Sequence, residues 1–232
     1  MFRHRAGALV VFVAAVLLAP AVASAQQSIS FNVGYFAVRG EDSRADGDVL
    51  FEDLAFHTFD VSEFSSASFG AEWLFPLGDF IEGGVGAGFY RRTIPTFYTE
   101  LVNETGAEIE QDFKLRVIPL NATVRFLPLG RHAAVQPYVG AGLGIFAWRY
   151  SETGEFVDEF SNIFRGRFIE SGTATGPLVF GGVRFPVGNN FLVGGEARWQ
   201  RAEGEFEEPA NFNGDRIDLG GITWQANVIF RF

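Results

Sequence analysis

Apolar and polar residues alternate along the segment 222–232, up to its last residue. One parity is apolar throughout, and the other carries Thr223, Gln225, Asn227 and Arg231, with Ile229 as its apolar exception. Because successive side chains of a β-strand point to opposite faces, this pattern predicts a strand with one face toward lipid and one toward a polar interior. The apolar parity consists of Ile222, Trp224, Ala226, Val228, Phe230 and Phe232.

Further alternating segments are separated by connections that are short and long in turn. The short ones, 76–79, 128–134 and 186–190, are rich in turn residues, and the long ones are mostly acidic. Short periplasmic turns and long extracellular loops are typical of outer-membrane barrels, and an even strand number places both ends on the periplasmic side. We therefore predict an all-β fold, a single antiparallel up-and-down transmembrane β-barrel of about eight strands, with ten as the alternative. The predicted strands are 29–39, 66–75, 80–92, 115–127, 135–150, 173–185, 191–201 and 217–232.

The start of the chain has the pattern of an export signal. A basic stretch with Arg3 and Arg5 precedes an apolar run over 6–18, and Ala23-Ser-Ala25 fits a cleavage site for signal peptidase. We predict a signal peptide over 1–25 and an outer-membrane β-barrel domain over 26–232. The expected location is the outer membrane of a Gram-negative bacterium, reached through the periplasm.

Composition narrows the class of protein. The chain has 27 Phe and 28 Gly and is 47% hydrophobic, yet 20% of its residues are charged, as alternating rather than continuous hydrophobicity requires. The formal charge of −10 argues against nucleic acid as a partner. The sequence contains no cysteine, so no disulfide forms in the oxidising periplasm.

Several charged residues fall on the parity that should face the interior. They are either solvated surface charges or members of a network inside the barrel. An eight-stranded barrel is only wide enough to be filled by side chains, so inward charges of both signs favour a salt-bridged plug over a selective channel lining. The predicted lumen charge network consists of Glu72, Glu82, Arg125, Arg184, Glu196, Arg198 and Arg231.

Three segments resemble a known family. The runs 118–126 and 136–144, together with the ending at Phe232, resemble the OmpA/OmpW-like family of small outer-membrane β-barrels. The resemblance implies a C-terminal assembly signal formed by Trp224, Val228, Phe230 and Phe232. It also implies a monomer that contacts outer-membrane lipid and lipopolysaccharide, assembled with periplasmic chaperones and the barrel-assembly machinery. The chain differs from OmpA in ending at the barrel, without the peptidoglycan-binding domain.

Within the run 136–144, the glycines share one parity. Gly140, Gly142 and Gly144 should face the lumen and leave room for bulky Arg or Glu side chains from neighbouring strands.

Catalysis has little support in the sequence. His57 and His132 are the histidines downstream of the predicted signal peptide. We expect His132 in a periplasmic turn and His57 in the first long loop, beside Asp53 and Asp60, as a solvated side chain. We predict no enzyme activity, no cofactor and no bound metal.

Two non-enzymatic functions remain open, with a lipid-modifying enzyme as a remote third. One is a structural or surface-interaction barrel, and the other is a narrow channel for a small hydrophobic molecule. The apolar patch 49–56 in the first long loop either lines the entrance of such a channel or folds back over the barrel mouth as a short helix or hairpin. We favour the second arrangement.

Overall fold

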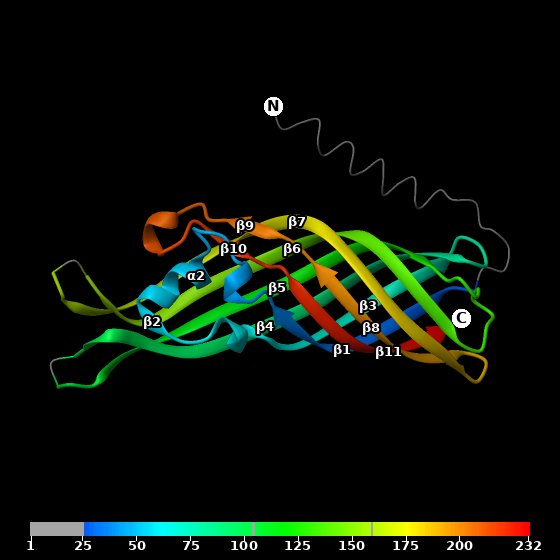
Figure 1. The fold of residues 1–232 in the computed structure, drawn as a ribbon, viewed down its shortest axis with the longest axis horizontal. Helices are drawn as coiled ribbons and strands as arrows, with labels where there is room; N and C mark the ends of the chain where they lie inside the picture. Colours follow the sequence, from blue (N-terminus) through cyan, green and yellow to red (C-terminus); the bar gives the residue numbers. More distant parts are fainter. Residues whose placement is uncertain (1–25, 104, 159) are drawn as a thin grey trace, which may run out of the picture.

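The chain forms a closed antiparallel β-barrel (Figure 1). The computed structural model describes residues 26–103, 105–158 and 160–232, so the predicted signal peptide lies outside the described residues. The nine-stranded main sheet consists of a closed ring of eight strands and one two-residue strand, β2 (His57–Thr58), and the ring closes where β1 pairs with β11. This confirms eight strands rather than ten. The ring strands are β1 (Ser28–Val38), β3 (Ser66–Pro76), β4 (Ile81–Val102), β5 (Glu108–Phe126), β6 (Gln136–Val157), β7 (Ile163–Val187), β8 (Phe191–Gln200) and β11 (Gly221–Arg231).

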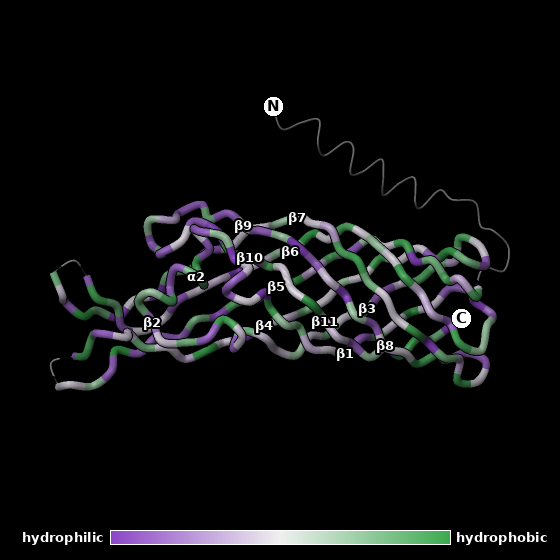
Figure 2. The backbone as a smooth tube through the Cα atoms, in the orientation of Figure 1, coloured by the Kyte–Doolittle hydropathy of each residue, from purple (hydrophilic) through white to green (hydrophobic). Residues whose placement is uncertain are grey.

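The outer wall is apolar over the half of the barrel that carries the tight turns. Phe31, Leu143 and Trp224 are 59%, 70% and 61% exposed, on the parity that the sequence assigned to lipid. Figure 2 shows hydrophobic and hydrophilic positions alternating along these strands. Such a wall is stable in a bilayer, where all backbone groups are paired within the closed ring.

Four strands are longer than the sequence predicted. The stretches 93–102, 108–114, 151–157 and 163–172 were expected in loops but continue β4, β5, β6 and β7 as two tall hairpins. Here the inward parity remains largely apolar, while the outward parity becomes polar and charged. The predicted strands were recognised by their apolar outer face, so they end at the membrane boundary. The paired strands of the structure continue beyond it.

The first long connection fills the extracellular mouth of the barrel. It contains η1 (Glu41–Ser43), α2 (Val49–Glu52), η2 (Asp53–Ala55), β2 and η3 (Val61–Phe64). Val49 and Leu50 are fully buried, so the apolar patch 49–56 folds back as a short helix, as predicted. No helix among the described residues is long and apolar enough to cross a membrane.

The last connection also contains regular structure. The short strands β9 (Glu203–Glu205) and β10 (Arg216–Asp218) pair with each other, and η4 (Pro209–Asn211) lies between them. The predicted strand 217–232 is therefore interrupted: β10 ends at Asp218 and β11 begins at Gly221. Both β9 and β10 lie beside the first connection at the mouth (Figure 1).

Buried apolar residues form separate clusters inside the barrel. The largest occupies the extracellular half, where Leu50 and Phe64 of the first connection pack with Phe113 and Tyr150 of the ring. At the opposite end Leu74, Leu192 and Ile229 form a small cluster. This contact explains the apolar exception at Ile229, which faces other apolar side chains rather than the charged interior.

Candidate functional site

Four charged side chains of alternating sign meet in the middle of the bore. Arg125 Nη2 lies 2.5 Å from Glu72 Oε2 and 3.6 Å from Glu196 Oε2. Arg198 Nη2 lies 2.8 Å from Glu196 Oε1 and 3.5 Å from Glu72 Oε2. Each carboxylate thus contacts both guanidinium groups, and all four residues are buried. Such compensation is what permits charges to remain inside a narrow, poorly hydrated space.

Neutral donors complete the coordination of the two carboxylates. The hydroxyl of Thr123 donates to Glu72 at 2.6 Å, and the hydroxyl of Tyr138 donates to Glu196 at 3.0 Å. The amide of Gln225 also donates to Glu196, at 2.9 Å. A buried carboxylate with several donors is held in one position, so this layer is rigid.

Both arginines of this layer contact the same aromatic ring. The guanidinium carbons of Arg125 and Arg198 lie 4.9 and 5.1 Å from the centre of the Phe180 ring, within the range of cation–π contacts. A Cβ at Gly140 would collide with that ring, so the glycine makes room for it. The lumen-facing glycines of 140–144 were expected to make room for Arg or Glu, but Gly140 and Gly144 instead accommodate the rings of Phe180 and Phe146.

A second charged layer lies nearer the periplasmic end. Arg184 Nη2 contacts Glu82 Oε1 at 2.7 Å, and Arg184 Nε donates to Gln136 Oε1 at 2.9 Å. Arg231 donates to the same oxygen of Gln136 at 3.2 Å and to the carbonyl of Arg131. Among the described residues Arg231 forms no ion pair, so it joins this layer through Gln136 rather than through a carboxylate.

Both layers connect strands that are not neighbours in the ring. Arg125 of β5 reaches Glu72 of β3 and Glu196 of β8, and Arg184 of β7 reaches Glu82 of β4. The structure therefore brings together six of the seven predicted lumen residues as ion pairs. A cavity of about 60 Å³ lies above the first layer, between its charges and the apolar mouth. Chemically, this arrangement can cross-link the wall and occupy the bore.

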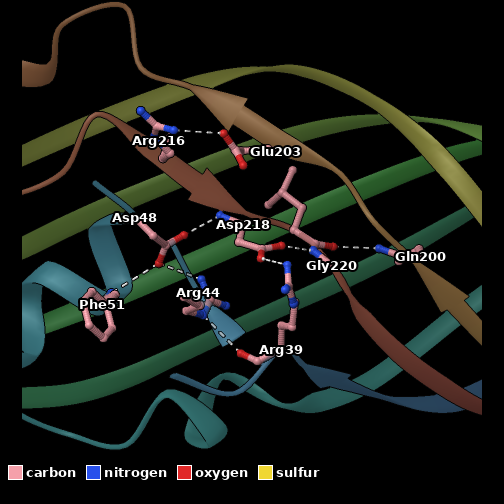
Figure 3. Close-up of polar contacts among 10 residues, drawn as sticks. Arg39, Arg44, Asp48, Phe51, Gln200, Glu203, Arg216, Asp218 and Gly220 are labelled. Atoms are coloured by element: carbon pink, nitrogen blue, oxygen red, sulfur yellow. Dashed lines mark hydrogen bonds and ion pairs between the residues drawn. The ribbon is translucent and has the colours of Figure 1, made fainter. Parts of the chain in front are cut away.

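A buried aspartate ties the first connection to the last one (Figure 3). Asp48 accepts from the guanidinium of Arg44 at 2.7 Å and from the backbone N–H of Asp218 at 2.5 Å. It also caps α2 by accepting from the N–H of Phe51 at 3.2 Å. Asp218 in turn pairs with Arg39 at 2.9 Å. These contacts anchor α2 at the mouth to the end of β1 and to β10.

Two carboxyl groups share the interior of the mouth. Asp53 accepts from Tyr150 at 3.2 Å and from Asn213 at 2.8 Å, and Glu152 lies close to it. Both carboxyl groups lie in the extracellular part of the barrel. Burial raises the pKa of Asp53 to about 7, and burial together with the nearby Asp53 carboxyl raises the pKa of Glu152 to about 9. At neutral pH this pair therefore holds at least one proton.

His57 is buried rather than solvated, which corrects the expectation from its loop position. It is 4% exposed and packs between the rings of Tyr98 and Phe113, whose centres lie 4.4 and 5.0 Å from its own. Burial lowers its pKa to about 4, so the ring is neutral and serves as a packing element. His132 lies in a periplasmic turn, as expected, with Asp79 at 3.8 Å. The described part of the chain contains no cluster of three or more metal-ligating side chains.

Sequence reasoning missed the polar groups of the mouth. Asp48, Asp53 and Glu152 lie in segments that read as acidic, solvated loops. The available signal was that Asp48 directly precedes the apolar run Val49-Leu-Phe, which is the position of a helix N-cap. Tyr138 and Gln136, on the lumen parity beside the glycines, were also overlooked. The side chains of the predicted assembly signal, Trp224, Val228, Phe230 and Phe232, are all exposed on the outer wall.

Comparisons with known proteins found similar solved structures but no similar sequence family. No protein-family model matches the sequence, and no curated protein matches it significantly. The outer-membrane protein OprG from Pseudomonas aeruginosa has a similar structure, with a TM-score of 0.50 and 11% identity, over 90% of this chain and 96% of that one. Ail from Yersinia pestis, in complex with the heparin analogue sucrose octasulfate, has a TM-score of 0.46 and 13% identity over 90% and 99%. Neisserial surface protein A has a TM-score of 0.46 and 14% identity, over 89% of this chain and 97% of that one.

The likeness to OprG, at a TM-score of 0.50 and 11% identity, concerns the fold alone. It agrees with the small antiparallel β-barrel fold that the sequence predicted. Independently of this likeness, the exposed apolar wall is suited to lipid, and the closed ring leaves no unpaired strand edge within a bilayer. The protein is an integral outer-membrane β-barrel protein.

Proposed function

We propose that this protein is a closed, non-catalytic barrel that carries an interaction surface on the outside of the cell. The observation that carries the proposal is the pairing of charges from opposite walls in two layers, Glu72–Arg125–Glu196–Arg198 and Glu82–Arg184. A solute would have to separate these pairs, leaving buried charges uncompensated at a cost of several kcal/mol. The charged side chains in the bore therefore cross-link the wall and leave no path for a solute.

The two tall hairpins, β4–β5 and β6–β7, form the proposed interaction surface. They extend beyond the apolar wall at the end opposite the tight turns (Figure 1). Near their tips Val102 is 61% and Phe160 84% exposed, so the hairpins offer apolar contact area to another surface. The filled mouth and bore hold the hairpin bases rigidly. The other proposed partners are membrane lipid and lipopolysaccharide, with chaperones and the barrel-assembly machinery during biogenesis of a monomer.

Single-channel recording in planar bilayers tests the closed bore. The wild-type barrel should show no steady conductance, and the double variant E72Q/E196Q should flicker because its two arginines then repel each other without counter-charges. The variant E110Q, which removes an exposed carboxylate of the β5 extracellular segment, is the control. Steady, large conductance of the wild type would contradict the proposal, because it would mean that the charges line an open water path.

A second candidate function is a narrow channel for a small hydrophobic molecule. It is favoured by the apolar cluster at the mouth, where Leu50 and Phe64 of the first connection cover Phe113 and Tyr150 of the ring. Displacement of α2 would uncover an apolar entrance. Saturable binding of a hydrophobic dye by the wild type, abolished by a disulfide that locks α2 to β6, would favour this function over the first.

A further inference from the structure

Five basic side chains gather on the outer wall of β4 to β7. Arg91 pairs directly with Arg116 across β4 and β5, and Arg116 pairs directly with Arg149 across β5 and β6. Lys114 is the next outward residue of β5, and Arg167 lies on β7. Together with Ser151 these residues line a hollow of about 90 Å³. We refer to Arg91, Lys114, Arg116, Arg149 and Arg167 as the basic patch.

The basic patch is not neutralised by ion pairs within the protein. None of its five members forms an ion pair within the described ranges, although acidic residues outnumber basic ones in the sequence. The pKa of Lys114 is lowered by slight burial and by the arginines of the patch. Like charges placed directly opposite each other on paired strands are destabilising. The patch is thus suited to an anion that the protein does not itself supply.

The height of the patch identifies the kind of anion. Arg91 lies ten residues along β4 from Ile81, which is beside a tight turn. With a rise of about 3.3 Å per residue and a strand tilt of about 40°, the height between these two residues along the barrel axis is roughly 25 Å. That is about the height of the apolar band of an outer-membrane barrel. Directly below the arginine row the wall is apolar, with Leu120 50% and Ile145 41% exposed. The patch therefore lies at the outer edge of the membrane.

We propose that the basic patch binds the phosphate groups of lipid A in the lipopolysaccharide of the outer leaflet. Its arginines can donate paired N–H groups to the phosphate oxygens, and the apolar wall below can contact the acyl chains of the same molecule. This continuity of charge and apolar surface favours a phosphorylated lipid over a soluble phosphate. The inference deepens the lipid contact of the proposed function and is independent of whether the bore conducts.

Titration of the full barrel in zwitterionic detergent tests the inference. Lipid A with both phosphates and the same lipid with its phosphates removed are each added, and native mass spectrometry counts the lipids bound. We expect the wild type to bind the phosphorylated form at least about tenfold more tightly, because charge-assisted hydrogen bonds are lost with the phosphates. This arm needs no variant, so it does not depend on how a substitution affects folding.

Two matched double variants locate the site. R116Q/R149Q should weaken binding of phosphorylated lipid A roughly tenfold or more, whereas R165Q/R201Q, which removes two exposed arginines outside the patch, should stay within about twofold. Equal binding of both lipid forms, or equal loss in both variants, overturns the proposal. Inorganic phosphate is titrated separately. If it binds as tightly as lipid A, the site takes soluble phosphate and the lipid assignment is wrong.

Discussion

Arg125 on β5 and Glu72 on β3 form an ion pair across the bore, although β4 lies between their strands. Their side chains are 4% and 3% exposed, so water hydrates neither charge and each depends on its ion-pair partners. The pair connects parts of the wall that backbone hydrogen bonds do not connect directly. Its removal should therefore affect the barrel as a whole.

The variant Arg125→Met should lose roughly 3–5 kcal/mol of stability, because it leaves Glu72 and Glu196 with one guanidinium between them. The double variant E72L/R125M keeps Glu196 paired with Arg198 and should recover most of that loss. Urea unfolding in phospholipid vesicles, followed by tryptophan fluorescence, measures both. A double variant no more stable than R125M would argue against an energetic role for the pair.

The variant Gly84→Ala should destabilise the same layer. A Cβ at this position would press on the carboxylate of Glu72, the hydroxyl of Thr123 and the guanidinium of Arg125. Overpacking of this kind costs typically about 1–3 kcal/mol. Gly195→Ala is the matched control, since its Cβ would meet only a backbone oxygen at 3.8 Å. The same unfolding assay measures both variants. Equal loss of stability in the two would show that the ion-pair layer can accommodate the added methyl group.

Acidification should loosen the mouth through His57. Its folded-state pKa of about 4 lies below the ordinary value of 6.5, so its contribution is fully present above pH 6.5 and decreases as the pH falls toward 4. The loss reaches at most about 3 kcal/mol. Limited proteolysis of the segment 41–65 between pH 7 and pH 4 should show increasing cleavage in the wild type and less in His57→Phe. His132→Gln, in an exposed periplasmic turn, should behave as the wild type does.

Alkaline pH should loosen the mouth through a different pair. Asp53 and Glu152 have raised pKa values of about 7 and about 9, so their contribution is present below pH 4 and is lost as the pH rises through those values. Glu152→Gln keeps a donor toward Asp53 and removes the need for a shared proton. Proteolysis of 41–65 between pH 6 and pH 10 should increase in the wild type and increase less in this variant, in which only Asp53 still loses a proton. An unchanged alkaline increase in Glu152→Gln would exclude the pair as its cause, and E110Q serves as the control.

Phe232 should act in assembly rather than export. Its deletion, or Phe232→Glu, should reduce the amount of folded barrel in the outer membrane while the protein still reaches the periplasm. Fractionation with heat-dependent gel mobility measures both quantities, since closed barrels resist detergent until heated. Phe160→Glu, at an exposed hairpin tip, controls for the loss of an aromatic residue. Normal membrane yield without Phe232 would contradict the predicted assembly signal.

The alternation of side chains determined the fold and the direction of each side chain. Strand periodicity is a local property, so Glu72, Glu82 and Arg125 could be placed inside, and Trp224 and Phe230 outside, from their parity alone. Mixed charge on the inner face then indicated a filled bore, because eight strands enclose too little space for hydrated charges. These inferences required no knowledge of which strand faces which.

Only the tertiary structure decided which groups meet. Arg125 selects Glu72 and Glu196, and Arg231 contacts Gln136, because barrel closure and strand stagger bring distant strands to one height. His57 looked solvated in the sequence because its burial arises from a connection that folds back into the mouth. The row of Arg91, Arg116 and Arg149 likewise exists only through the register of three paired strands. Register depends on the patterns of both paired strands and on the turn that joins them, so the sequence of one strand alone does not show it.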